Sequence, residues 1–135
     1  MNHWLMKSEP DAFSWDDLVR KGTAEWDGVR NYLAQSHMKA MKTGDRAFFY
    51  HSNIGLEIVG VMEIVAKATP DSTDETGKWI AVHVSPVEPL KLPVTLKQMK
   101  ADPALADMVM LRQSRLSVSP VTRAQYDHIL RLGGL

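Results

Sequence analysis

Residues 44–68 read GDRAFFYHSNIGLEIVGVMEIVAKA, and this stretch decides the fold class of the sequence. Gly44-Asp45 is a turn signal, and Arg46–His51 follows it as a strand. Ile54–Ala68 is rich in isoleucine and valine, which predicts a long strand with a bulge at Gly60. The middle of the chain is therefore expected to form part of a sheet.

Further strands and helices are expected on both sides of this stretch. The expected strands are His3–Lys7, Trp79–Val84 and Arg115–Val118. The expected helices begin at the capping residues Ser14, Thr95 and Thr122, and others span Tyr32–Met41 and follow Asp102-Pro103. Pro86, Pro89 and Pro93 confine their segment to edge or loop geometry, because proline has no N–H to donate. Strands and helices mix without a regular βαβ alternation, which predicts an α+β fold in which helices surround a small barrel, as one domain of residues 1–135.

The composition narrows the class of protein. The chain has 135 residues, of which 44% are apolar, and it contains no cysteine. Disulfides, thiolate metal sites and cysteine nucleophiles are therefore excluded. The sequence contains no apolar run long enough to predict a membrane span, and its first residues do not have the pattern of a signal peptide. We therefore expect a cytoplasmic protein, or a nuclear one in a eukaryote. Sixteen basic residues balance sixteen acidic ones, which argues against affinity that comes mainly from covering many phosphates.

Catalytic signatures are absent from the sequence. None of the common hydrolase, metalloprotease, phosphate-binding or dinucleotide-binding motifs occurs, and the five histidines show no metal-ligand spacing. Tyr50-His51-Ser52 is the one run with a catalytic composition, but adjacent residues of a strand point to opposite faces. We therefore expect no enzyme, no metal and no cofactor.

Binding of a planar ligand fits the residues better. Bases are held by aromatic stacking and by hydrogen bonds to their edges, while arginine or lysine meets the backbone. Four segments offer such groups: Lys7-Ser8, Trp26–Tyr32 (WDGVRNY), Phe48–Ser52 and Arg112–Arg115.

Each segment also has a structural interpretation, and composition alone leaves the choice open. Trp26 could close one end of a barrel, and Asn31 could cap a helix. Tyr50 and His51 lie on opposite sides of one strand, so both cannot be assumed to reach a ligand.

The order of these segments resembles the EVE domain family. The motifs are WLMKSEP (4–10), FSWDDL (13–18), WDGVRNY (26–32), GD with FFYHSN (44–45 and 48–53), IVGVMEIV (58–65) and LRQSRLSVSPV (111–121). The resemblance covers essentially the whole chain. It implies a PUA-like fold, which is a curved mixed β-barrel of about five or six strands surrounded by short helices. It also implies a non-catalytic reader of modified bases in DNA or RNA.

The resemblance implies a binding site drawn from twelve residues. These are Lys7, Ser8, Trp26, Asn31, Tyr32, Tyr50, His51, Ser52, Arg112, Gln113, Ser114 and Arg115. Trp26 would stack on the base, the hydroxyl and amide groups would test its edge, and the basic residues would meet phosphate. Asp27 and Arg30 are expected outside the pocket, paired with one another. The helix that follows departs from the family pattern, because Leu33 and Gln35 stand where a glutamine and an arginine are common.

The leading hypothesis is a monomeric, non-catalytic binding domain for a modified base in DNA or RNA. One alternative is an enzyme on a planar, nucleotide-like substrate that uses His51 as general base with Tyr50 or Ser52 nearby. Another is a small-metabolite sensor or a protein-interaction module.

Overall fold

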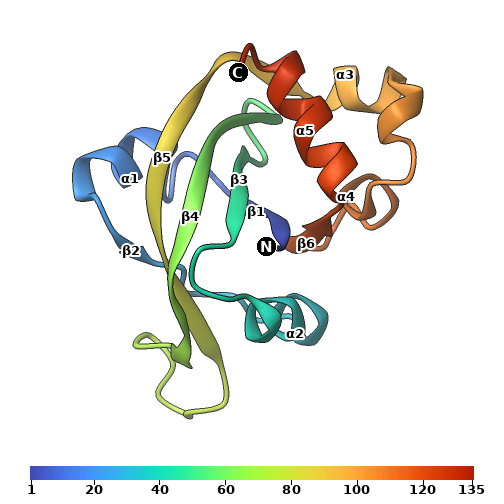
Figure 1. Ribbon diagram of the computed structural model, residues 1–135. Coiled ribbons are helices and arrows are strands. Elements are labelled where there is room, and N and C mark those ends of the chain that lie inside the picture. The colour runs from blue at the N-terminus through green and yellow to red at the C-terminus, as the bar shows by residue number, and fades with distance from the viewer.

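The structure, a computed structural model, describes residues 1–135 as strands and short helices around one sheet (Figure 1). The strands are β1 (His3–Ser8), β2 (Ala24–Glu25), β3 (Arg46–His51), β4 (Glu57–Pro70), β5 (Ile80–Thr95) and β6 (Val118–Val121). The helices are α1 (Trp15–Lys21), α2 (Tyr32–Ala40), α3 (Leu96–Ala101), the 3-10 helix η1 (Pro103–Leu105), α4 (Val109–Arg112) and α5 (Arg123–Leu132). None of these helices has the length and apolar character needed to cross a membrane.

The six strands form one mixed sheet in the order β2-β5-β4-β3-β1-β6. Only β1 and β3 run parallel, while the other neighbours are antiparallel. The sheet curves strongly, with β4 and β5 forming a long hairpin that projects at the bottom of Figure 1. The expected α+β class, strand number and mixed curved sheet are confirmed. The sheet does not close into the expected barrel, because β2 and β6 end it without pairing with each other.

The bulge expected at Gly60 is confirmed. The register between β3 and β4 shifts at this point, with Phe49 opposite Gly60 and Tyr50 opposite Ile58. Glycine is required there because a Cβ at residue 60 would lie 2.6 Å from two ring carbons of Trp15. The indole of α1 therefore packs directly on the backbone of β4.

The C-terminal strand lies further along the chain than predicted. Arg115–Val118 was expected as a strand, but β6 spans Val118–Val121 and pairs with β1. Residues 113–116 instead form a turn that is closed by a hydrogen bond from Leu116 N to Gln113 O. The prediction was wrong because the local sequence does not show which residues pair with β1.

The proline-rich segment belongs to β5, where it forms an edge as expected. β2 pairs with β5 only at His83 and Val84, so the later part of β5 has β4 on one side alone. Pro86, Pro89 and Pro93 lie in that part, and proline is tolerated in such an edge segment.

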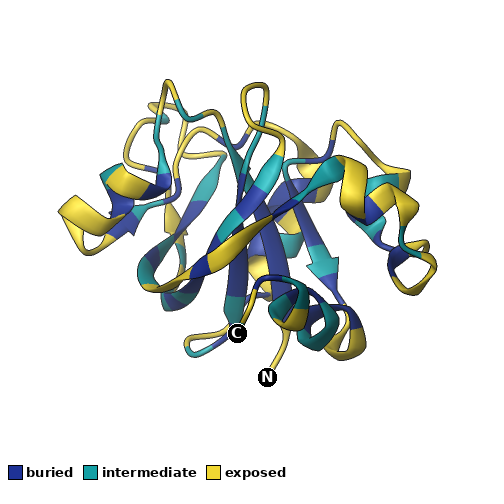
Figure 2. Cartoon of the chain, turned by 90° about the horizontal axis from the view of Figure 1, so that it is seen from above, coloured by how far each residue is buried: buried dark blue, intermediate teal, exposed yellow.

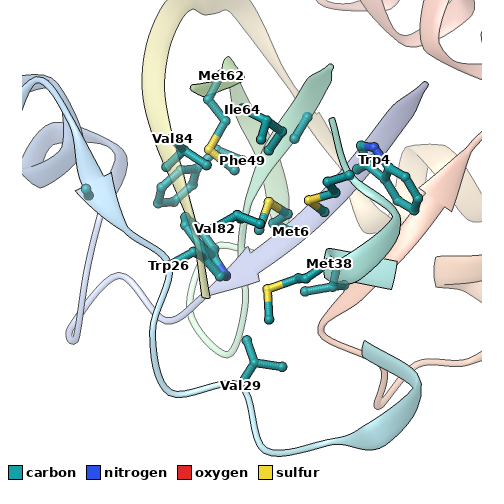
Figure 3. Packing of buried hydrophobic residues seen from close by; sticks show 14 of the residues in the cluster. Trp4, Met6, Trp26, Val29, Met38, Phe49, Met62, Ile64, Val82 and Val84 are labelled. Carbon is teal, nitrogen blue, oxygen red and sulfur yellow. The ribbon is translucent and has the colours of Figure 1, made fainter. Parts of the chain in front are cut away.

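Both faces of the sheet are covered, so the protein has two apolar cores. Figure 2 shows buried residues along the central strands and exposed residues on the outer sides of the helices. One core is covered by α1, α2 and the segment between β2 and α2, and it contains Trp26 and Phe49 (Figure 3). The other is covered by α3, η1, α4 and α5, and it contains Phe48 and Tyr50. Successive side chains of β3 therefore point alternately into the two cores.

Candidate functional site

A cavity of about 430 Å³ lies where β1 ends beside the segment that leads from β2 into α2. We call it the Trp26 cavity. Its lining residues are Lys7, Ser8, Ala12, Phe13, Lys21, Ala24, Glu25, Trp26, Asp27, Gly28, Val29, Arg30 and Ser117. Ligand pockets in proteins commonly enclose roughly 300–1,000 Å³, so this cavity has the size of a small-molecule site.

Trp26 lies at the boundary between the cavity and the core. Its backbone N–H donates to Val82 O at 2.8 Å, which fixes the segment to β5. Its ring meets Phe49 edge-on, with 5.3 Å between centroids, and Phe13 in the same manner at 6.4 Å. Only 6% of Trp26 is exposed, and Figure 3 shows its ring beside Val82 among the core side chains. Trp26 therefore completes the core, as one interpretation of the sequence held, and also lines the cavity.

The cavity rim is held by a buried carboxylate on the turn between β4 and β5. Asp71 accepts hydrogen bonds from Gly28 N at 2.9 Å and from Arg30 Nη1 at 3.0 Å. Gly28 has φ of +78°, a left-handed conformation that favours glycine, and this conformation turns its N–H toward Asp71. The expected pairing of Arg30 with Asp27 is wrong, since the partner of Arg30 lies 41 residues away.

Asp71 remains ionised over the whole neutral and mildly acidic range. Burial by itself raises the pKa of its carboxyl group. Hydrogen bonds from Thr73, Gly28 and Arg30 outweigh burial and hold the pKa well below its usual value. The rim of the cavity is thus organised by one charged group that is removed from solvent.

Charged side chains of both signs reach the cavity. Lys7 donates from Nζ to Ser114 O at 2.8 Å, and burial lowers the pKa of its ammonium group. The Ser8 hydroxyl donates to Phe13 O at 2.6 Å, which leaves its oxygen as an acceptor. Asp27 also lines the cavity, and its pKa is raised by burial and by the nearby carboxylates Asp71 and Glu25. A ligand in this cavity would meet hydrogen-bond donors and acceptors beside an aromatic wall.

A second, shallower hollow of about 360 Å³ carries the arginines of LRQSRLS. We call it the arginine depression, and it is lined by Asn31, Leu33, Arg112, Gln113, Ser114, Arg115 and Leu116. The Lys7–Ser114 hydrogen bond ties it to the Trp26 cavity. Arg115 is exposed, and Arg112 pairs with the exposed Asp107 at 2.5 Å. The depression is therefore a cationic surface next to the cavity.

Asn31 caps a helix, which is the structural role that the sequence allowed for it. Its Oδ1 accepts from Ala34 N at 2.9 Å and caps α2. The amide N–H groups of the same side chain are left over for an acceptor in the arginine depression. Different atoms of Asn31 can thus cap the helix and contact a ligand.

Four of the twelve expected site residues line neither hollow. Tyr50 is buried in the second core, because its side of β3 faces α5 and not Trp26. His51 Nε2 accepts from Trp15 N at 3.1 Å at the start of α1, and burial lowers the pKa of the imidazole. Ser52 donates its backbone N–H to Ser8 O at 2.9 Å. Tyr32 is 63% exposed and stacks on Trp79 outside the cavity.

Sequence reasoning did not assign several residues that line the cavity. Phe13, Glu25 and Ser117 are among them. Asp27 and Arg30 also line the cavity, so the expectation that they lie outside the pocket is wrong. Glu25, Asp27 and Arg30 are immediate neighbours of the assigned residues Trp26 and Asn31. Phe13 and Ser117 lie within the motifs FSWDDL and LRQSRLS, so most of the signal was present in the motifs. Which side of each motif faces the cavity depends on contacts with distant parts of the chain.

Another hollow lies elsewhere on the surface, and its chemistry is different. It encloses about 610 Å³ between the loop at Leu56 and α3, with Leu96, Lys97 and Lys100 in its lining. It is wide open and contains no aromatic ring. No group of three or more His, Asp or Glu side chains is placed to hold a metal ion.

These features define a class: an α+β domain whose curved mixed sheet supports an aromatic-walled cavity beside a cationic depression. The sequence model of the EVE domain matches residues 2–132, and the chain belongs to that family.

Relatives of known structure share the fold over nearly the whole chain. Protein Atu2648 from Agrobacterium tumefaciens is 48% identical, with a TM-score of 0.96 over 100% of this chain and 94% of that chain. Human THYN1 protein, solved in complex with DNA containing 5-methylcytosine, is 36% identical, with a TM-score of 0.93 over 100% of this chain and 99% of that chain. Among curated proteins, mouse thymocyte nuclear protein 1 is 39% identical over 97% of this chain and 73% of its own length.

Proposed function

We propose that this protein is a non-catalytic domain that binds a modified nucleobase within DNA or RNA, with the base in the Trp26 cavity. The observation that carries the proposal is the cavity itself, of about 430 Å³, in which Trp26 and Phe13 lie among polar and charged side chains. A nucleobase is a flat apolar ring with a polar edge, and it requires that combination.

The charge distribution around the cavity supports a ligand that continues as a strand. The arginine depression adjoins the cavity through Lys7, and Arg112 and Arg115 line it. In the proposed complex these side chains contact the phosphates on either side of the inserted base. The balanced total charge of the chain indicates that such contacts are few and that the base provides much of the affinity.

The polar groups of the cavity suit a base edge with both donors and acceptors. Asp27 provides an acceptor for an exocyclic amino group, and Lys7 provides donors for a ring nitrogen or carbonyl. Human THYN1 protein, which shares the fold, has been solved with DNA containing 5-methylcytosine. By similarity, a methylated cytosine is the first base to test here.

Fluorescence anisotropy with labelled oligonucleotides tests the proposal. Two strands of one sequence would be compared, one with a single 5-methylcytosine and one with cytosine at that position. Trp26→Leu removes the aromatic face while it retains most of the buried volume. We expect it to weaken binding of the modified strand by roughly 1–3 kcal/mol, the usual contribution of a stacked base.

Trp15→Leu is the matched control, because Trp15 is a 7% exposed tryptophan of the same core that does not line the cavity. It should lower stability without a selective loss of affinity. Equal affinities of the Trp26→Leu and Trp15→Leu proteins for the modified strand would refute the role of the cavity.

A further inference from the structure

Outside the cavity, two aromatic rings from different parts of the chain form a stack at the surface. The ring centroids of Tyr32, the first residue of α2, and Trp79, just before β5, are 5.0 Å apart with planes inclined by 28°. Tyr32 is 63% exposed although it is stacked. One face of its ring contacts Trp79, and much of the remainder is open to solvent.

Two cations accompany this stack. Arg30 Cζ lies 5.7 Å from the centre of the Trp79 ring. Lys78 Nζ lies 5.4 Å from the Tyr32 centre and 5.9 Å from the Trp79 centre. Since those two distances are almost equal, Lys78 sits at the side of the stack, and it leaves the outer face of Tyr32 uncovered. We call Arg30, Tyr32, Lys78 and Trp79 the aromatic ledge.

The ledge adjoins the cavity and the depression and is fixed in place. Arg30 lines the Trp26 cavity, and Asn31, the neighbour of Tyr32, lines the arginine depression. Asp71 holds Arg30, and Asp74 accepts from the backbone N–H of Trp79 at 2.8 Å. A strand with one base in the cavity would therefore pass close to the ledge.

The alternative is that the stack is purely structural and attaches the β4–β5 turn to α2. That attachment already exists, because Gln35 Oε1 of α2 accepts from Ile80 N at 3.0 Å and Asp71 binds the segment that precedes α2. Anchoring also does not require a tyrosine that is mostly exposed, with a lysine at its side. An open aromatic face with adjacent cations is the arrangement that binds single-stranded nucleic acid without reading its sequence.

We propose that the aromatic ledge binds a second, unmodified nucleotide of a single strand, whose base stacks on Tyr32 and whose phosphate contacts Lys78. This inference rests on the proposed function, since the strand is placed by the base in the cavity. It adds a contact that depends on strand length and not on the modification.

The experiment uses the full chain and three probes: a seven-nucleotide single strand with one central 5-methylcytosine, the same strand with cytosine, and 5-methyldeoxycytidine monophosphate. Tyr32→Ala should weaken binding of both strands by roughly 5- to 100-fold, the effect of losing one stacked base, and leave the mononucleotide unchanged. Tyr32→Phe should bind like the wild type. Lys78→Ala should lower the slope of log affinity against log salt by about one, whereas Lys39→Ala, an exposed lysine at the other end of α2, should not.

The outcomes separate the ledge from the cavity. Unchanged strand affinity of Tyr32→Ala, or an equal loss for the strand and the mononucleotide, overturns the ledge and leaves the proposed function standing. If Tyr32→Ala weakens both strands while Trp26→Leu leaves the preference between them unchanged, the ledge is upheld and the base cavity fails. Thermal unfolding of each variant verifies that the protein is folded in every comparison.

Discussion

Removal of the Asp71 carboxylate should loosen the rim of the Trp26 cavity and destabilise the protein. Its two oxygens accept four hydrogen bonds, from Gly28 N, Arg30 Nη1, Thr73 N and Thr73 Oγ1, at 2.7–3.0 Å. The Asp71 side chain is fully buried, whereas that of Arg30 is 39% exposed. Asp71→Ala therefore leaves these donors without their acceptor, although water can partly reach them.

The magnitude follows from that exposure. A hydrogen bond to a charged group contributes about 1.5–3 kcal/mol when its partners are buried. Because Gly28, Arg30 and Thr73 are exposed enough to be rehydrated, the four bonds together should contribute about 2–4 kcal/mol. Asp71→Asn keeps the shape but loses the charge and turns an amide toward the donors, so about 1–2 kcal/mol is expected.

The pH dependence has a definite sign. The pKa of Asp71 in the folded protein lies below its ordinary value of 3.8, so the unfolded chain binds the proton more readily. The stabilisation is fully present above about pH 4 and is lost as the pH falls through the folded pKa. The difference in stability between the wild type and Asp71→Asn should therefore narrow in acid.

Urea unfolding at several pH values measures both effects, and hydrogen exchange at the Gly28 amide reports on the rim directly. Asp74→Ala is the matched control. Asp74 lies on the same turn, and hydrogen bonds from Thr76 and the backbone of Trp79 lower its pKa to about 2, but it does not bind the cavity rim. Asp71→Ala with an unchanged urea midpoint and wild-type protection at Gly28 would refute the reasoning.

Three further predictions concern the frame around the site. Gly60→Ala should destabilise the protein by about 1–3 kcal/mol, since its Cβ would overlap the Trp15 ring. The loss of stability measured by urea unfolding should be smaller in a Trp15→Phe background, and equal losses in both backgrounds would contradict the prediction. His51→Ala should lower the free energy of unfolding by about 1 kcal/mol at pH 7.5, because Trp15 N loses its acceptor. This loss of stability should shrink as the pH falls below 6.5, since the lowered pKa of His51 means that the folded protein favours the neutral imidazole. A loss that is independent of pH would argue against this role. Thr122→Ala should cost about 1 kcal/mol by thermal unfolding through loss of the capping box with Gln125, and an unchanged melting temperature would disprove that role.

Features that depend on near neighbours were predictable from the sequence. The caps at Ser14, Thr95 and Thr122 are confirmed, because each contact is made within three residues of the cap. The bulge at Gly60 and the edge position of the prolines in β5 also follow from properties of single residue types.

The candidate site was only partly predictable. The Trp26 and Arg112–Arg115 segments, which were expected in one pocket, line two neighbouring hollows. Tyr50 was assigned to the same site, but the alternation of β3 cannot show that its second face is covered as well. Asp71, which organises the rim, lies in a polar turn with no distinguishing local pattern.

By itself, the sequence determined the α+β class, most of the strands and helices, and the segments that supply aromatic and cationic groups. These properties depend on periodicity and capping, which act over a few residues. Only the tertiary structure decided that Trp26 belongs to both core and cavity, that Asp71 is the partner of Arg30, and that Tyr32 and Trp79 form a ledge. The Arg30–Asp71 and Tyr32–Trp79 contacts join residues 41 or more positions apart, and only the tertiary fold brings such pairs together.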